Sequence, residues 1–284
     1  MNNMFLWVVL ITLVAGVGGT GLGGLVSICL KYDSKRIVSL FLSFAGGIML
    51  SVVCFDLIME AIAPESPADE VGIYTVIAGI AIGYVVVWLL NYFIDKSTNP
   101  ELEHIDGQHP KTADDLDELI HSDHQEKHLE ERSSLFVAGL IMAAAIALHN
   151  LPEGMVIGSA YVGGEVEGLW TGSGFVMACL IGLHNVPEGM AITVPLVAGG
   201  MKRGRAVLIT ALSGLPTVFG AMLGYWLGSM GPLMHALSLS FASGAMLYVV
   251  FGELLPEAIL MWRSKLPAVS AVIGMAVGLI ILYA

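Results

Sequence analysis

The sequence predicts an all-α membrane protein whose eight transmembrane helices form an inverted repeat. Hydrophobic residues make up 56% of the chain and charged residues only 13%, whereas charged residues make up roughly 25% of an ordinary soluble domain. Eight apolar stretches are long enough to cross a hydrocarbon core, which takes about 20 residues. They lie at residues 4–30, 38–63, 71–94, 134–158, 173–197, 205–229, 233–261 and 266–284.

The first apolar stretch, 4–30, is predicted to be a retained span and not a cleaved signal peptide. No Lys or Arg precedes it, and no small-residue cleavage pattern follows it. The three cysteines, Cys29, Cys54 and Cys179, all fall within spans. They therefore predict neither a disulfide framework nor a CxxC metal motif.

The second and seventh stretches carry related sequences. The segment Phe44–Val53 recurs 197 residues later as Phe241–Val250. Acidic residues follow both copies at matching positions: Asp56, Glu60, Glu253 and Glu257. A chain that crosses the membrane eight times runs in opposite directions in these two spans, which is the signature of an inverted-topology repeat. Transporters of that design bind their substrate near the bilayer midplane, where the repeats meet.

The fourth and fifth stretches each contain one copy of a polar hexapeptide. It reads His-Asn-Leu-Pro-Glu-Gly at 149–154 and His-Asn-Val-Pro-Glu-Gly at 184–189. Residues four apart share one face of a helix, so each helix presents a histidine beside a glutamate. The proline removes a backbone hydrogen bond and predicts a kink in each helix. Each of these two spans therefore offers a pair of metal ligands.

The carboxylates of the hexapeptides predict a divalent cation. A charged side chain at mid-bilayer costs about 2.5–3.5 kcal/mol on the lenient insertion scale, and no Lys or Arg in the interior of a span is available to Glu153 or Glu188. Two carboxylates neutralise a divalent cation, and two neutral imidazoles complete a set of four ligands. A histidine that merely hydrogen-bonds a neighbouring helix would explain each imidazole alone. It does not explain why two histidines and two carboxylates occur together in spans without Lys or Arg.

The distribution of charge predicts the orientation. All twelve Lys and Arg residues lie in alternate loops. The opposite loops hold no Lys or Arg, and their charged residues are all acidic: Glu65, Asp69, Glu70, Glu165 and Glu167. The positive-inside rule then places both termini outside and the connection between the third and fourth spans in the cytoplasm. That connection holds half of the 24 acidic residues. The net charge of −12 therefore comes largely from this loop, and it does not indicate a nucleic-acid-binding surface. No nucleic-acid partner is expected, and the lipid bilayer surrounds the spans.

The chain divides into four predicted parts. They are spans one to three in 1–95, an acidic cytoplasmic loop in 96–132, the metal-binding spans in 133–198, and spans six to eight in 199–284. The loop has few apolar residues, which predicts weak order. His121, His124 and His128 would share a face if 116–131 formed an amphipathic helix, as in a cytoplasmic metal acceptor or sensor. A solvated tether with incidental histidines fits the same composition.

Over essentially its whole length the chain resembles the ZIP (Zrt/Irt-like) divalent-metal transporters of the bacterial type. The resemblance rests on the eight spans, the histidine-bearing loop after the third, and the paired HNxPEG motifs. It implies a 3+2+3 helix arrangement, a homodimer, and transport of zinc or a related ion towards the cytoplasm. Carried over by position, the primary ligands would be His149, Glu153, His184 and Glu188.

The resemblance also reaches the second and sixth spans. The FAxGxML segment of the second span matches and suggests Met49 as a thioether ligand, although a core methionine would look the same. Family members with two adjacent metals carry an acidic residue on the sixth span, where this chain has Thr217. Asn150 and Asn185 offer side-chain oxygens to a second ion, which should bind weakly without that added charge.

The predicted function is transport of a divalent metal ion across the plasma membrane, which in a bacterium is the inner membrane. Imidazole and carboxylate ligands suit zinc and cadmium first, with iron, manganese and cobalt as further candidates. The repeat suggests Asp56 and Glu60 as the outer end of a metal pathway and Glu253 and Glu257 as its cytoplasmic end. Helix-end acids satisfied by water would have the same pattern.

Three other functions would also use buried histidines and glutamates. A metal-gated channel or a metal sensor could use the same ligands. An intramembrane metalloenzyme of the HExxH kind would have a glutamate base where this chain has Asn150 or Asn185, so an enzyme is not expected. The sequence contains no P-loop, and we expect no organic cofactor.

Overall fold

The computed structural model describes residues 2–30, 35–64, 70–98, 132–163 and 172–283, and every regular element within these ranges is a helix. Within these ranges, eight helical segments are long and apolar enough to cross a membrane, which confirms the predicted number of spans. The largest difference in position is in the fourth span, Gly139–Val162, which was expected at 134–158. The spans are Met4–Cys29, Arg36–Ile62, Ile73–Phe93, Gly139–Val162, Ser173–Ala198, Arg203–Gly228, Pro232–Met261 and Leu266–Tyr283.

Four spans consist of more than one helical element within the described residues: short π-helical turns interrupt the first, second and seventh, and a two-residue turn at 214–215 divides the sixth. The first span is α1 (Asn2–Leu13), η1 (Val14–Gly18) and α2 (Gly19–Leu30), and the second is α3 (Lys35–Val52), η2 (Val53–Leu57) and α4 (Ile58–Ile62). The next three are single helices: α5 (Ile73–Thr98), α8 (Arg132–Gly163) and α9 (Ser173–Ala198). The last three are α10 (Arg203–Ser213) with α11 (Pro216–Gly228), then α12 (Pro232–Val249), η4 (Val250–Leu254) and α13 (Leu255–Met261), and finally α14 (Leu266–Tyr283).

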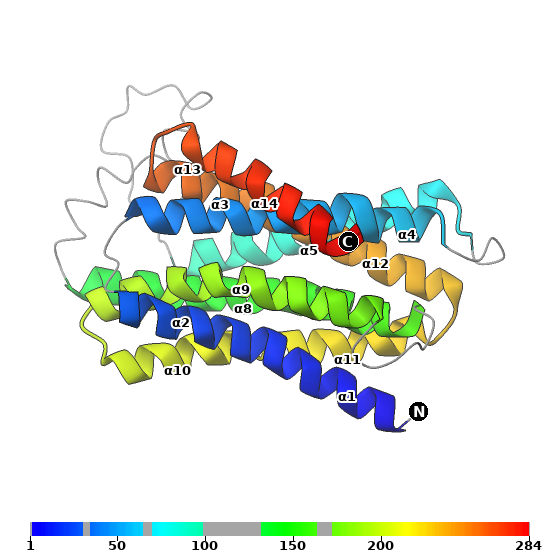
Figure 1. Ribbon diagram of the computed structural model, residues 1–284, viewed down its shortest axis with the longest axis horizontal. Coiled ribbons are helices and arrows are strands. Elements are labelled where there is room, and N and C mark those ends of the chain that lie inside the picture. Colours follow the sequence, from blue (N-terminus) through cyan, green and yellow to red (C-terminus); the bar gives the residue numbers. More distant parts are fainter. Residues whose placement is uncertain (1, 31–34, 65–69, 99–131, 164–171, 284) are drawn as a thin grey trace.

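The helices lie side by side along the long axis of the molecule (Figure 1). Both chain termini lie at the end that holds α4, and α13 lies at the opposite end. Span two therefore runs towards the end at which span seven begins. The two copies of the repeated segment run in opposite directions, as the sequence predicted.

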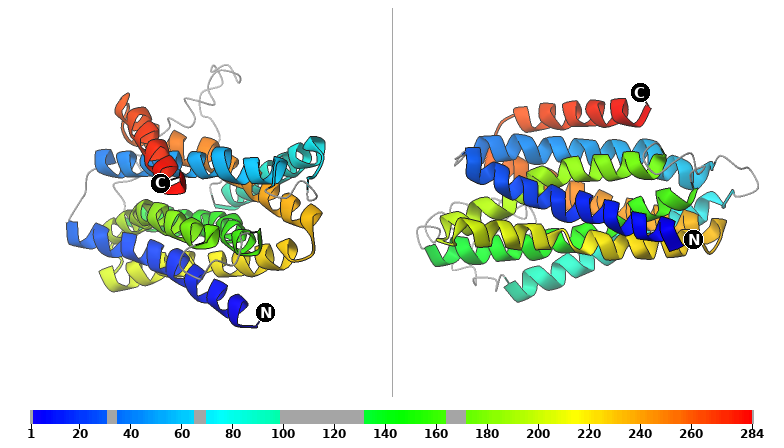
Figure 2. Two further views of the ribbon diagram at one scale, coloured as in Figure 1. Left: turned by 45° about the vertical axis from the view of Figure 1, so that its right-hand side comes forward. Right: turned by 60° about the horizontal axis from the view of Figure 1, so that its bottom comes forward.

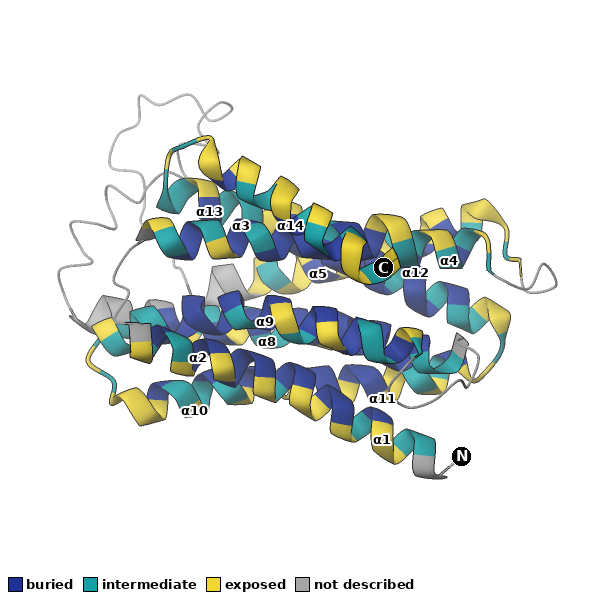
Figure 3. Ribbon diagram, viewed as in Figure 1, coloured by how far each residue is buried: buried dark blue, intermediate teal, exposed yellow. Residues whose placement is uncertain are grey.

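The helices that carry the hexapeptides lie inside the bundle. In Figure 1 and in the left view of Figure 2, α8 and α9 lie between α3, α5 and α14 on one side and α2, α10 and α11 on the other. In the fifth span 67% of the apolar stretch is buried, but in the eighth span only 17% is. Figure 3 shows the same contrast between α9 and α14. The outer faces carry large exposed apolar side chains such as Val14 and Ile280, as expected of a surface in contact with lipid.

The packing of the spans has the symmetry of the repeat. The fifth span packs on the first through α9 and α2, and the fourth packs on the sixth through α8 and α11. The second packs on the eighth through α3 and α14, and the seventh packs on the third through α12 and α5. The repeat exchanges spans one to three with spans six to eight, and span four with span five. Under this exchange the contact of spans five and one becomes that of spans four and six, and the contact of spans two and eight becomes that of spans seven and three. This pattern supports the inverted repeat, and the 3+2+3 grouping stays a prediction.

The helix interruptions also follow the repeat. The turns η2 and η4 are 197 residues apart, the same offset that relates the repeated segments. Turns of this kind disturb the regular helical hydrogen bonds and are frequent at functional sites. By contrast, α8 and α9 continue as helices through Pro152 and Pro187, and the predicted kinks there stay predictions.

Candidate metal centre

Three of the four predicted primary ligands form a compact group between α8 and α9. The ligand atoms of Glu153, His184 and Glu188 all lie within 4.8 Å of one another. His184 Nε2 lies 3.0 Å from Oε1 of Glu153. Two ligand atoms on a tetrahedral zinc ion are about 3.3 Å apart when their bonds are about 2.0–2.1 Å long. The spacing of this histidine and glutamate therefore suits two ligands of one ion.

The fourth predicted ligand, His149, contacts a residue of the seventh span. Its Nε2 lies 2.7 Å from Oε2 of Glu253, which belongs to η4. The His149 side chain is 4% exposed and the Glu253 side chain 18%. The structure thus attaches Glu253 directly to the predicted ligand set and makes it the most exposed member of the group.

The carboxylates of the centre are buried without full compensation. Glu153 and Glu188 are both 0% exposed. Within the described part of the chain, neither oxygen of Glu188 has a hydrogen-bond partner, and Oε2 of Glu153 also lacks one. An unpaired buried charge is costly. A divalent cation bound between the two helices would satisfy these oxygens.

The asparagines of the hexapeptides bond the backbone where neighbouring spans are irregular. Asn150 Nδ2 donates to the carbonyl of Ser213 at 2.9 Å, at the end of α10. Asn185 Nδ2 donates to the carbonyl of Ala15 in η1 at 3.3 Å. These bonds fix the orientation of both amides. Their oxygens, Oδ1 of each, are buried and have no partner among the described residues, so they fit the predicted role as further metal ligands.

The glycine that ends each hexapeptide is a point of close helix contact. A Cβ on Gly154 would collide with the backbone of Thr217 in α11, and a Cβ on Gly189 would collide with the backbone of Thr20 in α2. Small residues at such positions let helix backbones approach closely. Thr20 and Thr217 are themselves 197 residues apart. The two hexapeptide helices are therefore anchored at equivalent positions of the repeat.

Thr217 of α11 lies beside the fourth span, because a Cβ on Gly154 would collide with its backbone. It is 0% exposed, and its hydroxyl has no hydrogen-bond partner in the described ranges. The residue is neutral, and a Cβ on Gly16 in η1 would lie 2.6 Å from its hydroxyl oxygen. The expectation of a weak second ion is compatible with this arrangement and stays a prediction.

The remaining predicted residues lie on other helices or outside the described ranges. Met49 is fully buried in α3, a helix that packs on α9. Asp56 in η2 is partly buried, and Glu60 lies in α4, at the opposite end of the molecule from Glu257 in α13 (Figure 1). His121, His124 and His128 lie outside the described residues. Their roles stay predictions.

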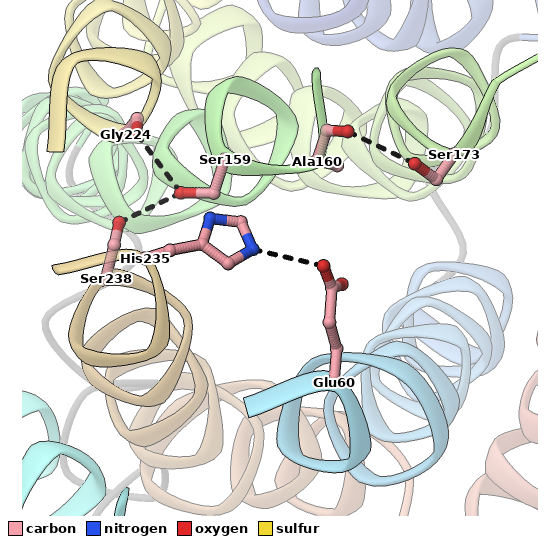
Figure 4. A network of polar contacts seen from close by, with 7 residues as sticks. All are labelled: Glu60, Ser159, Ala160, Ser173, Gly224, His235 and Ser238. Carbon is pink, nitrogen blue, oxygen red and sulfur yellow. Dashed lines mark hydrogen bonds and ion pairs between the residues drawn. The ribbon is translucent and has the colours of Figure 1, made fainter. Parts of the chain in front are cut away.

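One histidine was missed by the sequence analysis. His235 lies near the start of α12, and its Nε2 is 3.1 Å from Oε1 of Glu60 (Figure 4). The sequence did hold a signal, because His235 is the single histidine outside the hexapeptides and the 96–132 loop. Its partner could not be read from the sequence, since the two residues are 175 positions apart.

Comparison with known proteins identifies the family of this chain. The ZIP Zinc transporter family matches residues 4–284. The zinc transporter ZupT of Chlorobium luteolum is 34% identical over 98% of this chain and 97% of its own length. The proteins of the same name from Clostridium perfringens and Corynebacterium efficiens are 30% and 31% identical, over 98% and 94% of this chain and 95% and 92% of their own lengths. The chain therefore belongs to the ZIP family of zinc transporters.

Proposed function

We propose that this chain transports a divalent metal ion, zinc in the first place, across the plasma membrane towards the cytoplasm. The observation that carries the proposal is the buried group of Glu153, His184 and Glu188, which lies in the middle of two interior spans with carboxylate oxygens left unpaired. The names of the relatives support zinc as the substrate. Cadmium, iron, manganese and cobalt also bind imidazole and carboxylate, so selectivity is a separate question.

The route of the ion follows from the exposure of the ligands. His149 completes the four-ligand set when it turns from Glu253 to the ion. Glu253 is the partly exposed partner of this histidine, so it receives the ion from the buried centre on the cytoplasmic side. Glu257 on α13 is the next carboxylate along the exit path. Asp56 and Glu60 lie on the outer side. This orientation rests on the positive-inside rule, which places both termini outside and the acidic loop in the cytoplasm.

Further ligands extend the centre without adding charge. The oxygens of Asn150 and Asn185 offer a second, weaker position, shared through the two glutamates. Met49 would supply a soft thioether from the second span. Thr217 contributes only a hydroxyl, so a second ion there is expected to bind far more weakly than the first. We also propose a homodimer, and the loop histidines as a low-affinity acceptor on the cytoplasmic side.

A carrier fits the geometry better than a channel or a sensor. The three grouped ligands are at most 1% exposed, so the ion site is closed off from water, as alternating access requires. An enzyme is disfavoured because the relatives are transporters and Asn150 and Asn185 leave no spare base beside the ligands. Counterflow of zinc in proteoliposomes separates a carrier from a channel, because only a carrier exchanges ions against their own gradient.

Uptake of zinc by purified protein in proteoliposomes tests the ligand assignment. Glu188→Gln removes a ligand charge at nearly constant volume and is expected to abolish uptake. Glu70→Gln changes an exposed glutamate far from the centre in sequence and is the matched control, with uptake retained. Normal uptake by Glu188→Gln would refute the proposed centre.

A further inference from the structure

The outer end of the bundle holds a second histidine and glutamate pair. Glu60 comes from α4 of the second span and His235 from α12 of the seventh, and their Nε2 and Oε1 atoms lie 3.1 Å apart. In Figure 4 the imidazole points away from α12 towards the carboxylate of Glu60. The two side chains are 15% and 31% exposed. Unlike the buried centre, this pair is within reach of water and dissolved ions.

The pair has the chemistry of a transition-metal site. Its nitrogen and oxygen are close to the separation of about 3.3 Å expected for two ligands of one tetrahedral zinc ion. An imidazole favours zinc and related metals over calcium or magnesium, which prefer oxygen ligands alone. His235 Nδ1 has no hydrogen-bond partner among the described residues. It lies against Gly228, where a Cβ would be 3.0 Å from this nitrogen.

Two buried serines lie near His235, one of them one helical turn further along α12 (Figure 4). Ser238 is three residues after His235 on α12, and its Oγ lies 2.9 Å from Oγ of Ser159 on α8 (Figure 4). These serines are 2% and 0% exposed. Ser159 follows Glu153 by six residues on the same helix, a rise of about 9 Å. A set of polar groups thus begins at the exposed pair and continues on the helix that carries the buried centre.

We propose that Glu60 and His235 form an outer capture site, which binds a divalent transition-metal ion before it reaches the buried centre. Metal binding follows from the pair itself, and its role in capture rests on the proposed function. Two protein ligands with water in the remaining positions bind more weakly than four. Weak binding suits a site from which the ion has to move on.

Zinc protection of an introduced thiol tests the site directly. The full chain is purified with Cys29, Cys54 and Cys179 replaced by alanine, with Glu60→Cys to retain a zinc ligand, and with Glu188→Ala to disable the buried centre. Zinc is expected to slow the reaction of the thiol at position 60 with a maleimide. Adding His235→Gln should raise the half-protecting zinc concentration about tenfold, the loss typical of about 1.4 kcal/mol. The matched control is Ser173→Cys, at an exposed position whose hydroxyl bonds Ala160, which zinc should leave unprotected.

Equal protection with and without His235, or no protection at all, would overturn the metal site. The result does not depend on transport, so it is separable from the test of the buried centre. In the otherwise unaltered chain, Glu60→Gln and His235→Gln should each raise KM for zinc uptake about tenfold while kcat is kept, and Glu70→Gln should raise neither. A pair that only ties α4 to α12 would lower kcat or the amount of folded protein instead. That outcome, or an unchanged KM, would overturn the capture role.

Discussion

The two hexapeptide helices, α8 and α9, have nearly the same motif and nearly the same backbone surroundings, but their histidines have different partners. Gly154 and Gly189 pack on Thr217 and Thr20, which are related by the repeat. His184 bonds Glu153 across the helix pair, whereas His149 bonds Glu253 of the seventh span. The repeated sequence therefore determines an equivalent scaffold on both sides. The histidine that contacts an acidic residue of a distant span, His149, is the one outside the three-ligand group.

The repeat counterpart of Glu253 is Asp56, whose side chain is shorter by one methylene. His184 bonds Glu153 and lies in the three-ligand group. The asymmetry thus coincides with a difference of one carbon between two otherwise equivalent positions.

The largest effect is expected at Gly154 and Gly189, where the hexapeptide helices touch the backbones of α11 and α2. Gly154→Ala and Gly189→Ala should each destabilise the protein by about 3 kcal/mol, at the upper end of overpacking costs, because the obstacle is the backbone of the facing helix. Thermal unfolding in detergent measures the loss. Gly204→Ala is the control and should be tolerated, since nothing lies within 4 Å of a Cβ there. If only one of the two hexapeptide glycines tolerates alanine, the scaffolds are not equivalent.

The next effect separates the two histidines. His184→Ala should lower zinc affinity about a hundredfold, or about 2.7 kcal/mol, because His184 already lies in the ligand group. His149→Ala should cost only about tenfold, because this histidine gives up its bond to Glu253 when it turns to the ion. Zinc titration of the full chain, with the loop histidines replaced by alanine, measures both. Equal losses would show that the bond to Glu253 does not compete with the metal.

Much of this centre could be predicted from the sequence because its parts are local. Four-residue spacing on a helix predicts that His149 and Glu153 share a face, and buried carboxylates without Lys or Arg predict a cation. The eight spans follow from apolar length, and the inverted repeat follows from the related segments. The contacts of His149 with Glu253 and of His235 with Glu60 could not be predicted in the same way. Each joins spans that are far apart in the chain, and only the packing of the folded bundle decides which acid a histidine meets.

The turns η1, η2 and η4 were also beyond the sequence analysis. A π-helical turn adds one residue to a helical turn and leaves the apolar composition of the span unchanged. Asn185 shows the consequence, because its amide bonds the carbonyl of Ala15 inside such a turn. The asparagines were predicted as ligands through their oxygens. Their nitrogens prove to hold the irregular backbone of neighbouring spans.

Removing Glu253 should abolish the difference between the histidines. In a Glu253→Ala background His149 has lost its competing partner, so His149→Ala should now cost about as much affinity as His184→Ala. The shift relative to the unaltered background is about tenfold, or about 1.4 kcal/mol. A double-mutant cycle on zinc affinity isolates this coupling between residues in contact. Zero coupling would contradict the assigned competition.

The smallest effect concerns Thr20 and Thr217, the equivalent residues on which the hexapeptide glycines pack. The Thr20 hydroxyl donates to the carbonyl of Gly16 at 2.9 Å, so Thr20→Val removes a buried hydrogen bond and should cost about 0.5–1.5 kcal/mol of stability. The Thr217 hydroxyl is buried and has no partner in the described ranges, so Thr217→Val should be neutral or stabilise the protein by less than about 1 kcal/mol. Unfolding of both variants measures the difference between two positions with the same residue.

The same pair of variants tests what the unpaired hydroxyl does. If Thr217 Oγ1 helps to hold a second ion with Asn150 and Asn185, Thr217→Val should remove the weaker step of a zinc titration and leave the tight one unchanged, while Thr20→Val should keep both. Thr217→Glu should strengthen the weaker step, because it adds the charge that this position lacks. A weaker step that is indifferent to all three substitutions would place the second ion away from the sixth span. In that case the buried hydroxyl of Thr217 would serve only to fill the space beside Gly16, where an added Cβ would lie 2.6 Å from it.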